Sequence, residues 1–381
     1  MKRVSLNEEH GTDVTGDGSP NVSTTEASDT SIQRDHRRTI LHVSEALGGG
    51  IHTAIYNYSQ AANQANHVIF ARIREGQHTQ EWPETVSVVE YRGGMLNFYR
   101  AASRHIEDIA PDVIHLHSSY AGIMRAWLDE RRRIVYSPHC FAMERRGDTR
   151  LIRTLYWALE FLLSRKKQVY ACVSPREAEI VRFLNTHADA ALVPNYNASG
   201  ATTSVERKNS KAGKEKKIIT IGRVSKQKDP IFFANIAKDL GNDYNMIWVG
   251  DGDKGYKKIL EDSGVLVTGW VTPIEVAQIV ESADLYLHTA AWEGAPLSAI
   301  EAATMGCPVI ARTIPSMASL RYPLGGRDHQ QVSCSVKRFF SQDEYRRTVT
   351  AQTRAVVEEN SPGLARSTLD AIYAVDTKSS G

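Results

Sequence analysis

Two glutamates separated by seven residues, Glu293 and Glu301, carry the chemistry most readily seen in this chain. Between them stands Pro296, which suits the first turn of a helix because it has no N–H that would go unpaired there. A helix over Pro296–Met305 would present free N–H groups and the positive end of its dipole to a phosphate. Glu301 lies within that helix. The two carboxylates are therefore expected to hold different hydroxyls of one bound ligand.

A basic turn and a glycine-rich turn follow two expected strands upstream of the glutamates. Gly222 and Arg223 open the first turn, which ends at Lys228, and its guanidinium and ammonium groups suit a clamp on a diphosphate. Taken alone, this turn has the alternative of a solvated surface loop. Gly250 opens a Gly-Asp-Gly-Asp turn, where glycine lets the backbone approach a ligand closely. The alternative there is a tight turn that caps the next helix.

The first half of the chain offers glycines and histidines. Gly49 and Gly50 end a run of three glycines after a short apolar segment, and such small residues leave room for a ligand unless they form an ordinary flexible turn. His139 ends another strand-like segment. His115 and His117 alternate along a strand as a metal pair would, but no third ligand is recognisable. We therefore expect ordinary strand-end histidines and no metal site.

Short apolar runs alternate with amphipathic helical patterns on both sides of a polar stretch. This alternation is typical of parallel, doubly wound sheets, so it predicts an α/β fold with two Rossmann-like domains facing a cleft. Open sheets bind ligands beyond the carboxyl ends of their strands. The expected strands are Thr39–Val43, His67–Ala71, Ser87–Tyr91, Asp112–His117, Arg133–Ser137, Gln168–Val173, Ala190–Val193, Ile218–Gly222, Met246–Gly250, Val265–Thr268, Leu285–His288 and Pro308–Ala311. The clearest expected helices are Asn97–Ile109, Pro175–Leu184, Ile274–Glu281, Asp343–Glu359 and Leu364–Ala374.

Composition divides the chain into five parts. Residues 1–36 are polar and are expected to form a disordered tail, because they cannot bury enough apolar surface to offset ordering. Residues 37–197 form the predicted first domain, and the polar stretch 198–216 is the predicted linker. Residues 217–360 form the predicted second domain. Residues 361–381 are expected to hold a C-terminal helix, which can return to the first domain, and a tail.

The bulk numbers exclude several classes of protein. The 381 residues contain 46 Lys and Arg against 44 Asp and Glu, and a net charge of +2 gives no case for nucleic acid binding. The 4 cysteines show no metal-ligand spacing and are expected as reduced thiols. No apolar signal segment opens the chain, and no run reaches the roughly 18 apolar residues of a spanning helix. We expect a cytoplasmic protein, with the inner face of the membrane as its one further location.

The second half resembles the retaining glycosyltransferases of the GT-B class usually called family 4. The family's hallmark, a Glu, seven residues and a second Glu, stands here as Glu293 and Glu301. A Gly-Arg pair and a lysine upstream, and a Gly-Cys-Pro-Val turn at 306–309, complete the pattern. The resemblance implies a GT-B fold and transfer of a sugar from a nucleotide diphosphate. It also implies retention at the anomeric carbon and no need for a metal ion or other cofactor.

The resemblance implies roles for individual residues. Arg223 and Lys228 would hold the diphosphate and stabilise charge on the leaving group. Glu301 would bind the ribose hydroxyls and Glu293 hydroxyls of the donor sugar. Trp270 would lie beside the base, which the family contacts through its backbone. The residues expected to line the rest of the donor site are Gly49, Gly50, Gly222, Gly250, Gly294, Ala295, Pro296 and Leu297.

The likeness is looser in the first half. His139 ends its strand as the family ends one with a histidine beside the donor sugar, so it is the expected first-domain contact to that sugar. Residues 193–195, Val-Pro-Asn, match the segment that closes the family's first domain. The family often carries paired glycines and a glutamate where residues 313–317 read Thr-Ile-Pro-Ser-Met. This departure bears on the shape of the sugar pocket and leaves the diphosphate site untouched.

The donor is expected to be a UDP-sugar in preference to a GDP-sugar, and the acceptor a saccharide or a lipid-linked acceptor in surface polysaccharide or glycolipid assembly. Residues 150–167 are apolar with basic ends. They indicate either a peripheral contact with an anionic membrane or a core helix with solvated ends. The alternatives for the whole chain are a nucleotide-sugar epimerase or phosphorylase of the same fold and a non-catalytic accessory protein. The intact set of charged donor-site residues argues against the accessory protein.

Overall fold

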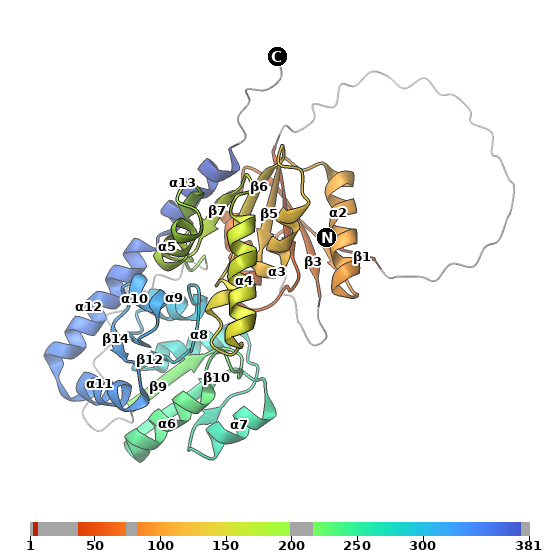
Figure 1. Cartoon of the computed structure of the whole chain (residues 1–381). Coiled ribbons are helices and arrows are strands. Elements are labelled where there is room, and N and C mark those ends of the chain that lie inside the picture. Colours follow the sequence, from red (N-terminus) through yellow and green to blue (C-terminus); the bar gives the residue numbers. More distant parts are fainter. Residues whose placement is uncertain (1–2, 7–36, 74–81, 199–215, 375–381) are drawn as a thin grey trace, which may run out of the picture.

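The computed structural model describes residues 3–6, 37–73, 82–198 and 216–374, which form two parallel β-sheets flanked by helices (Figure 1). The first sheet has the order β1-β4-β3-β2-β5-β6-β7-β8 and the second β11-β10-β9-β12-β13-β14. The predicted α/β fold with two doubly wound, Rossmann-like sheets is confirmed. The strands of the first sheet are β1 Arg3–Leu6, β2 Thr39–Ser44, β3 Asn66–Arg72, β4 Val86–Tyr91, β5 Val113–His117, β6 Arg133–Ser137, β7 Val169–Cys172 and β8 Asp189–Leu192. Those of the second are β9 Lys216–Ile221, β10 Tyr244–Val249, β11 Leu266–Val267, β12 Leu285–His288, β13 Val309–Arg312 and β14 Leu324–Gly326.

Several helices begin where the sequence supplies a capping side chain. Ser174, Thr272 and Ser361 each accept a hydrogen bond from a backbone N–H of the first turn, and a proline follows each of them. Thr272 and Glu275 form a reciprocal capping box. The α-helices are α1 Gly50–Ala61, α2 Met95–Ile109, α3 Ser118–Gly122, α4 Arg150–Leu163, α5 Pro175–Leu184, α6 Pro230–Leu240, α7 Lys254–Glu261, α8 Pro273–Ser282, α9 Leu297–Thr304, α10 Pro315–Ser319, α11 His329–Ser341, α12 Asp343–Glu359 and α13 Pro362–Tyr373. Short 3₁₀ turns lie at η1 Ile123–Ala126, η2 Ala142–Glu144 and η3 Gly241–Asp243.

Three details differ from the expectations. Four residues of the segment 1–36, predicted as a tail, form β1 in parallel with β4, because a sheet edge offers unpaired backbone groups that a short segment can satisfy. Residues 1–2 and 7–36 lie outside the described residues, as do 199–215 of the predicted linker and 375–381. β14 is absent from the predicted strands, because three residues with two glycines lack strand composition. Pro296 precedes α9 as its N-cap in an extended conformation, one position earlier than predicted.

The chain's last described helix packs against elements of the first sheet's half. α13 contacts α1, β6 and β8, and the Arg133 guanidinium donates to the Ile372 carbonyl oxygen at 3.1 Å. One buried apolar cluster includes Tyr58 of α1, Ile300 of α9 and Leu369 of α13. The two sheets are thus joined by a shared core in addition to the chain connection, and their carboxyl ends hold the candidate site between them.

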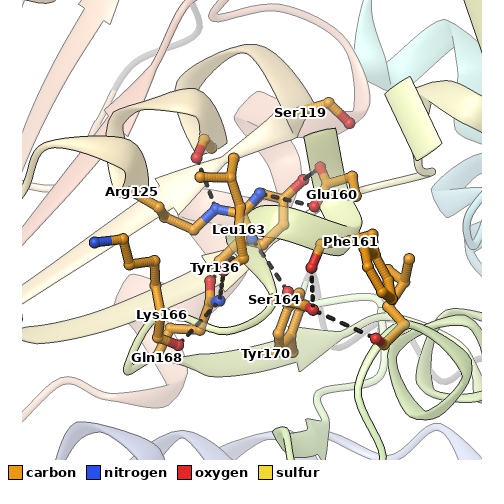
Figure 2. A network of polar contacts seen from close by, with 12 residues as sticks. Ser119, Arg125, Tyr136, Glu160, Phe161, Leu163, Ser164, Lys166, Gln168 and Tyr170 are labelled. Atoms are coloured by element: carbon orange, nitrogen blue, oxygen red, sulfur yellow. Dashed lines mark hydrogen bonds and ion pairs between the residues drawn. The ribbon is translucent and has the colours of Figure 1, made fainter. Parts of the chain in front are cut away.

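A buried polar network fastens α4 to the first sheet (Figure 2). The guanidinium of Arg125, in η1, forms an ion pair with Glu160 of α4 at 2.8 Å, with side-chain exposures of 0% and 4%. Arg125 also donates to Gln168 at 2.9 Å and lies 3.7 Å above the ring of Tyr136. The hydroxyl of Tyr136, on β6, donates to the second Glu160 oxygen at 2.8 Å. The inward face of α4 is therefore held by charge and hydrogen bonds.

The outward face of α4 carries large apolar side chains in contact with solvent. Leu151 is 70% exposed, Leu155 61% and Leu162 64%. This is the reverse of an ordinary surface helix, whose apolar stripe faces the core. The interpretation of 150–167 as a core helix with solvated ends therefore disagrees with the structure.

Candidate active site

The glycine turns of the second half meet at the carboxyl ends of β9 and β10. Gly222 and Gly250 both have positive φ, 148° and 138°, and a Cβ at Gly250 would overlap the Gly222 carbonyl oxygen. The Trp248 indole N–H donates to that same oxygen at 2.9 Å. Only glycine fits at position 250, because any side chain would collide with backbone. The two predicted turns thus pack directly against each other at the carboxyl end of the sheet.

Lys228 and Glu293, both predicted as catalytic, form an ion pair at 2.6 Å. The Lys228 side chain is 20% exposed and that of Glu293 is 11% exposed. Burial is the largest single influence and acts to lower the Lys228 pKa, but the charge of Glu293, the neighbouring Tyr286 and the hydrogen bond to Glu293 together raise the pKa. Lys228 therefore stays charged although its side chain is partly buried, and it lies beside Gly222.

The start of α9 is held by residues of the first half. The Asn195 amide donates to the Ala295 carbonyl at 2.7 Å, and a Cβ at Gly50 would lie 3.7 Å from a methyl of Leu297. The structure therefore brings Gly50 beside the predicted donor-binding residues Ala295 and Leu297. Gly49 adjoins this contact as the N-cap of α1, with φ of 54°.

Glu301 lies on α9 as a carboxylate without a hydrogen bond or ion pair to any described residue. Its side chain is partly buried, and loss of solvent raises its pKa above the ordinary range. A buried carboxylate usually has a partner in the folded protein. Glu301 is thus poised for hydroxyl groups of a ligand.

Two of the predicted donor residues are not gathered into the site. Arg223 is exposed and has no ion-pair partner in the described part of the chain. Trp270 is 65% exposed after the turn at Gly269. Both side chains are exposed to solvent at the rim of the candidate site. A bound ligand, rather than contacts within the protein, would have to fix their positions.

His139 lies opposite Gly294, across the two halves. A Cβ at Gly294 would fall 2.8 Å from the Cys140 nitrogen and 3.0 Å from the His139 carbonyl carbon, so only glycine allows this approach. His139 has φ of 49°, and the next residue's N–H donates to Glu177 at 2.6 Å. Burial raises the pKa of Glu177 to about 7, against hydrogen bonds from two backbone N–H groups. No local pattern marks Glu177, because its bond partner Cys140 lies in a loop 37 residues away.

A third histidine joins the pair that the sequence suggested. Atoms of His42, His115 and His117, all buried, lie within 4.8 Å of one another, as in a metal site. His115 bonds Tyr373 at 2.7 Å and Ser137 at 2.8 Å, and both ring nitrogens of His42 and His117 bond other histidines. All six nitrogens therefore have partners within the protein. His42 was missed because it reaches the pair only through strand pairing.

A cavity of about 1180 Å³ opens between the halves and reaches Glu293. Its first-half wall carries Arg146, Arg150 and Arg153 together with Trp157. Arg146 and Arg150 have no ion-pair partner among the described residues. Sequence reasoning noted these arginines only as the basic end of a helix, because their common wall is formed by the bend before α4. The cavity can hold an anionic ligand beside the candidate donor site.

No helix in the described ranges combines the length and apolar character needed to cross a membrane.

Two family models match most of the folded chain. Residues 49–196 match the model described as a glycosyl transferase 4-like domain, and residues 215–322 match glycosyl transferases group 1. A Klebsiella pneumoniae protein described as an uncharacterized 41.2 kDa protein in the cps region is 27% identical over 304 residues, which cover 73% of this chain and 82% of that protein.

A relative with a named activity and a solved structure extend this likeness. The Escherichia coli UDP-Gal:alpha-D-GlcNAc-diphosphoundecaprenol alpha-1,3-galactosyltransferase is 25% identical over 259 residues, which cover 60% of this chain and 64% of the relative. The crystal structure of Anabaena HepE with UDP and glucose has a TM-score of 0.68 at 14% identity, over 89% of this chain and 100% of HepE. At that identity the structure shows the shared GT-B fold alone.

Proposed function

Because the chain belongs to the group 1, family 4-like glycosyltransferases, we propose that it transfers a sugar from a UDP-sugar to a lipid-linked saccharide acceptor, with retention at the anomeric carbon. The observation that carries this proposal is the Lys228–Glu293 ion pair at 2.6 Å, in the segment that leads into α9, the helix on which Glu301 has no side-chain partner among the described residues. The reaction would serve surface polysaccharide or glycolipid assembly, in line with the cps region of the Klebsiella relative.

Lys228 would meet the charge that develops on the leaving diphosphate. Glu293 already orients its ammonium in a partly buried position, where a preorganised charge acts more strongly than in water. Arg223 would join as a second cation when the donor binds, and the free N–H groups at the start of α9 would add their dipole. As the diphosphate takes over Lys228, the Glu293 carboxylate becomes available to accept hydrogen bonds from the sugar.

Glu301 would accept hydrogen bonds from the ribose hydroxyls. Its lack of any partner among the described residues supports this role, because ribose would supply the two missing donors. UDP is preferred over GDP because the E. coli relative is named for UDP-Gal and HepE was crystallised with UDP. Trp270 at the rim would lie beside the base.

The acceptor would occupy the arginine-lined cavity. Arg146, Arg150 and Arg153 provide planar, permanently charged groups suited to a phosphate, and Trp157 provides an aromatic wall for a sugar or lipid. The name of the E. coli relative includes a diphosphate-linked lipid acceptor. The cavity reaches Glu293, so an acceptor bound there would lie next to the donor sugar.

Thermal unfolding with UDP, GDP, ADP and CMP, with and without EDTA, tests the donor site. UDP at about 100 times its dissociation constant is expected to add about 2.7 kcal/mol of stability, unchanged by EDTA. Glu301→Ala should weaken this stabilisation, while Glu281→Ala, an exposed glutamate of α8, should leave it unchanged. Stabilisation by GDP or ADP alone would overturn the choice of base. No shift with any nucleotide would contradict the donor site itself.

We also propose a peripheral contact between α4 and an anionic membrane, which the exposed leucines of this helix support. The exposed leucines would enter the headgroup boundary, and Arg150, Arg165 and Lys167, all exposed, would lie near the lipid phosphates. The cavity opens beside the same helix, since its lining includes Arg150 and Trp157. A protein docked through α4 on the inner face would therefore present the cavity to a lipid-linked acceptor.

Vesicle sedimentation tests this contact. The double variant Leu151→Asp, Leu155→Asp is expected to lower binding to vesicles with anionic lipid by at least about tenfold, because it removes apolar burial and adds repulsion. Leu96→Asp is the matched control, since Leu96 on α2 is 77% exposed but lies outside α4. Equal binding of both variants, or equal binding to neutral and anionic vesicles, would contradict the membrane contact.

A further inference from the structure

Four histidines form a continuous chain of hydrogen bonds that ends at His139. The His67 ring bonds the Ala62 carbonyl through Nε2 at 3.0 Å and His42 Nε2 through Nδ1 at 2.9 Å. His42 Nδ1 bonds His117 Nε2 at 2.9 Å, and His117 Nδ1 bonds His139 Nε2 at 3.0 Å. We call His67, His42, His117 and His139 the histidine wire.

The order of the strands creates the wire. His67 lies on β3, His42 on β2 and His117 at the end of β5, while His139 follows β6. These four strands are consecutive neighbours in the sheet. The wire therefore crosses the sheet one strand at a time, from a carbonyl at the end of α1 to the loop beside Gly294.

The carbonyl at one end decides the direction of every bond. A neutral imidazole has one nitrogen that donates and one that accepts. The Ala62 oxygen can only accept, so His67 Nε2 must carry a proton and His67 Nδ1 must accept. His42 Nε2 must then donate to His67 Nδ1, and His117 Nε2 must donate to His42 Nδ1. The Nδ1 atoms of His42 and His117 are therefore both acceptors. This leaves His139 with a proton on Nε2 and a lone pair on Nδ1, which has no partner in the described part of the chain.

We propose that the histidine wire fixes His139 as the Nε2–H tautomer, so that its Nδ1 accepts a hydrogen bond from a hydroxyl of the donor sugar. The sugar contact rests on the proposed function, whereas the tautomer does not. His67, His42 and His117 act as positioning residues, since they set the orientation and proton of His139 without touching the substrate. The wire carries no proton away, because it ends on a buried carbonyl that has none to exchange.

Burial keeps every ring of the histidine wire neutral. The bond directions above depend on this, because only a neutral imidazole has one nitrogen that donates and one that accepts. Loss of solvent lowers the pKa values of His42 and His117 well below the ordinary range, lowers that of His67, and lowers that of His139 to about 4. An extra proton on either inner ring would also place two N–H groups face to face. Near neutral pH each ring therefore has one proton.

His115 offers an internal comparison, because it stacks on His117 at 4.1 Å between centroids but lies off the wire. The Ser137 hydroxyl donates to the Ala171 carbonyl at 3.0 Å and accepts from His115 Nε2 at 2.8 Å. His115 Nδ1 then accepts from the Tyr373 hydroxyl. Removing that hydroxyl with Tyr373→Phe disturbs a neighbouring buried histidine while every bond of the wire remains.

Long-range ¹H–¹⁵N NMR of the protein labelled with ¹⁵N-histidine reads the tautomers directly, with the His139 signals assigned from their loss in His139→Asn. The wild type is expected to show His139 protonated at Nε2 alone, without any donor present. His42→Phe keeps a ring but cuts the wire from its carbonyl, so His139 should become a mixture of tautomers. Tyr373→Phe should leave His139 unchanged. An Nδ1–H tautomer in the wild type would overturn the proposal, even if His42→Phe failed to fold.

Kinetics test the sugar contact. His42→Phe is expected to lower kcat/KM for the UDP-sugar in proportion to the share of the Nε2–H tautomer that remains, about twofold for an equal mixture, with the KM for the acceptor unchanged. Tyr373→Phe should keep the wild-type value. A tautomer mixture without any change in kcat/KM would overturn the sugar contact. Failure of the wild type to bind UDP would count against the proposed function, while the tautomer is read independently of it.

Discussion

Lys228→Met is expected to lower the turnover of sugar transfer by about 10²- to 10³-fold, the usual cost of removing a preorganised group that stabilises developing negative charge. The ammonium is 2.6 Å from Glu293 and the Lys228 side chain is only 20% exposed, so water cannot fully replace the ammonium. The loss should appear mainly in kcat, because the leaving group gains charge in the transition state. Steady-state kinetics with the donor varied at saturating acceptor would measure it.

Two companion variants separate catalysis from folding at this site. Lys228→Met leaves Glu293 without its cation, so the double variant Lys228→Met, Glu293→Gln should recover stability but not turnover. Lys258→Ala is the matched control, because Lys258 is exposed on α7 and pairs with the exposed Asp262. Turnover of Lys228→Met within tenfold of the wild type would remove Lys228 from the mechanism.

Arg125→Met is expected to reduce the free energy of unfolding by about 3–5 kcal/mol, because it leaves Glu160 buried without a cation. The two side chains are 0% and 4% exposed, and among the described residues the carboxylate of Glu160 is otherwise held only by the Tyr136 hydroxyl. Urea unfolding followed by circular dichroism would measure the loss. Arg131→Met is the control, because Arg131 pairs with Asp129 at the surface, where water screens the ion pair and its loss is expected to change stability little.

Adding Glu160→Gln to Arg125→Met should restore part of the lost stability. The amide oxygen can still accept from Tyr136, and no buried charge remains. If the double variant were less stable than Arg125→Met, the cost would come from packing rather than from an unpaired carboxylate. That outcome would contradict the role given to this network in holding α4 with its apolar face outward.

Short apolar runs in the sequence predicted most strands of the two sheets. Three strands, β6, β12 and β14, show why this worked and where it failed. β6 and β12 stand where their apolar runs indicated, because strands buried on both faces are continuously apolar. The short β14 has no such run. Family resemblance placed Lys228 and Glu293 in one donor site, but their ion pair was not anticipated, since the two residues are 65 positions apart and meet through the pairing of β9 with β12.

Features that depend on the order of strands in the sheet, or on ion pairs between residues far apart in the chain, were not predicted from the sequence. The histidine wire joins residues up to 75 positions apart, and no local pattern marks His42 or His67 as neighbours of His117. The orientation of α4 was equally hidden. Its exposed leucines would favour burial on composition alone, and the pairing of Glu160 with the distant Arg125 helps to turn the opposite face inward.

Sugar transfer itself is the most direct test of the account. The protein would be incubated with labelled UDP-sugars, EDTA and vesicles that contain a lipid-diphosphate-linked N-acetylglucosamine, and the product linkage read by ¹H NMR. We predict label in the lipid-linked fraction with the anomeric configuration of the donor, without any added metal ion. Inverted configuration, or release of sugar to water without transfer to any lipid-linked or soluble saccharide, would contradict it.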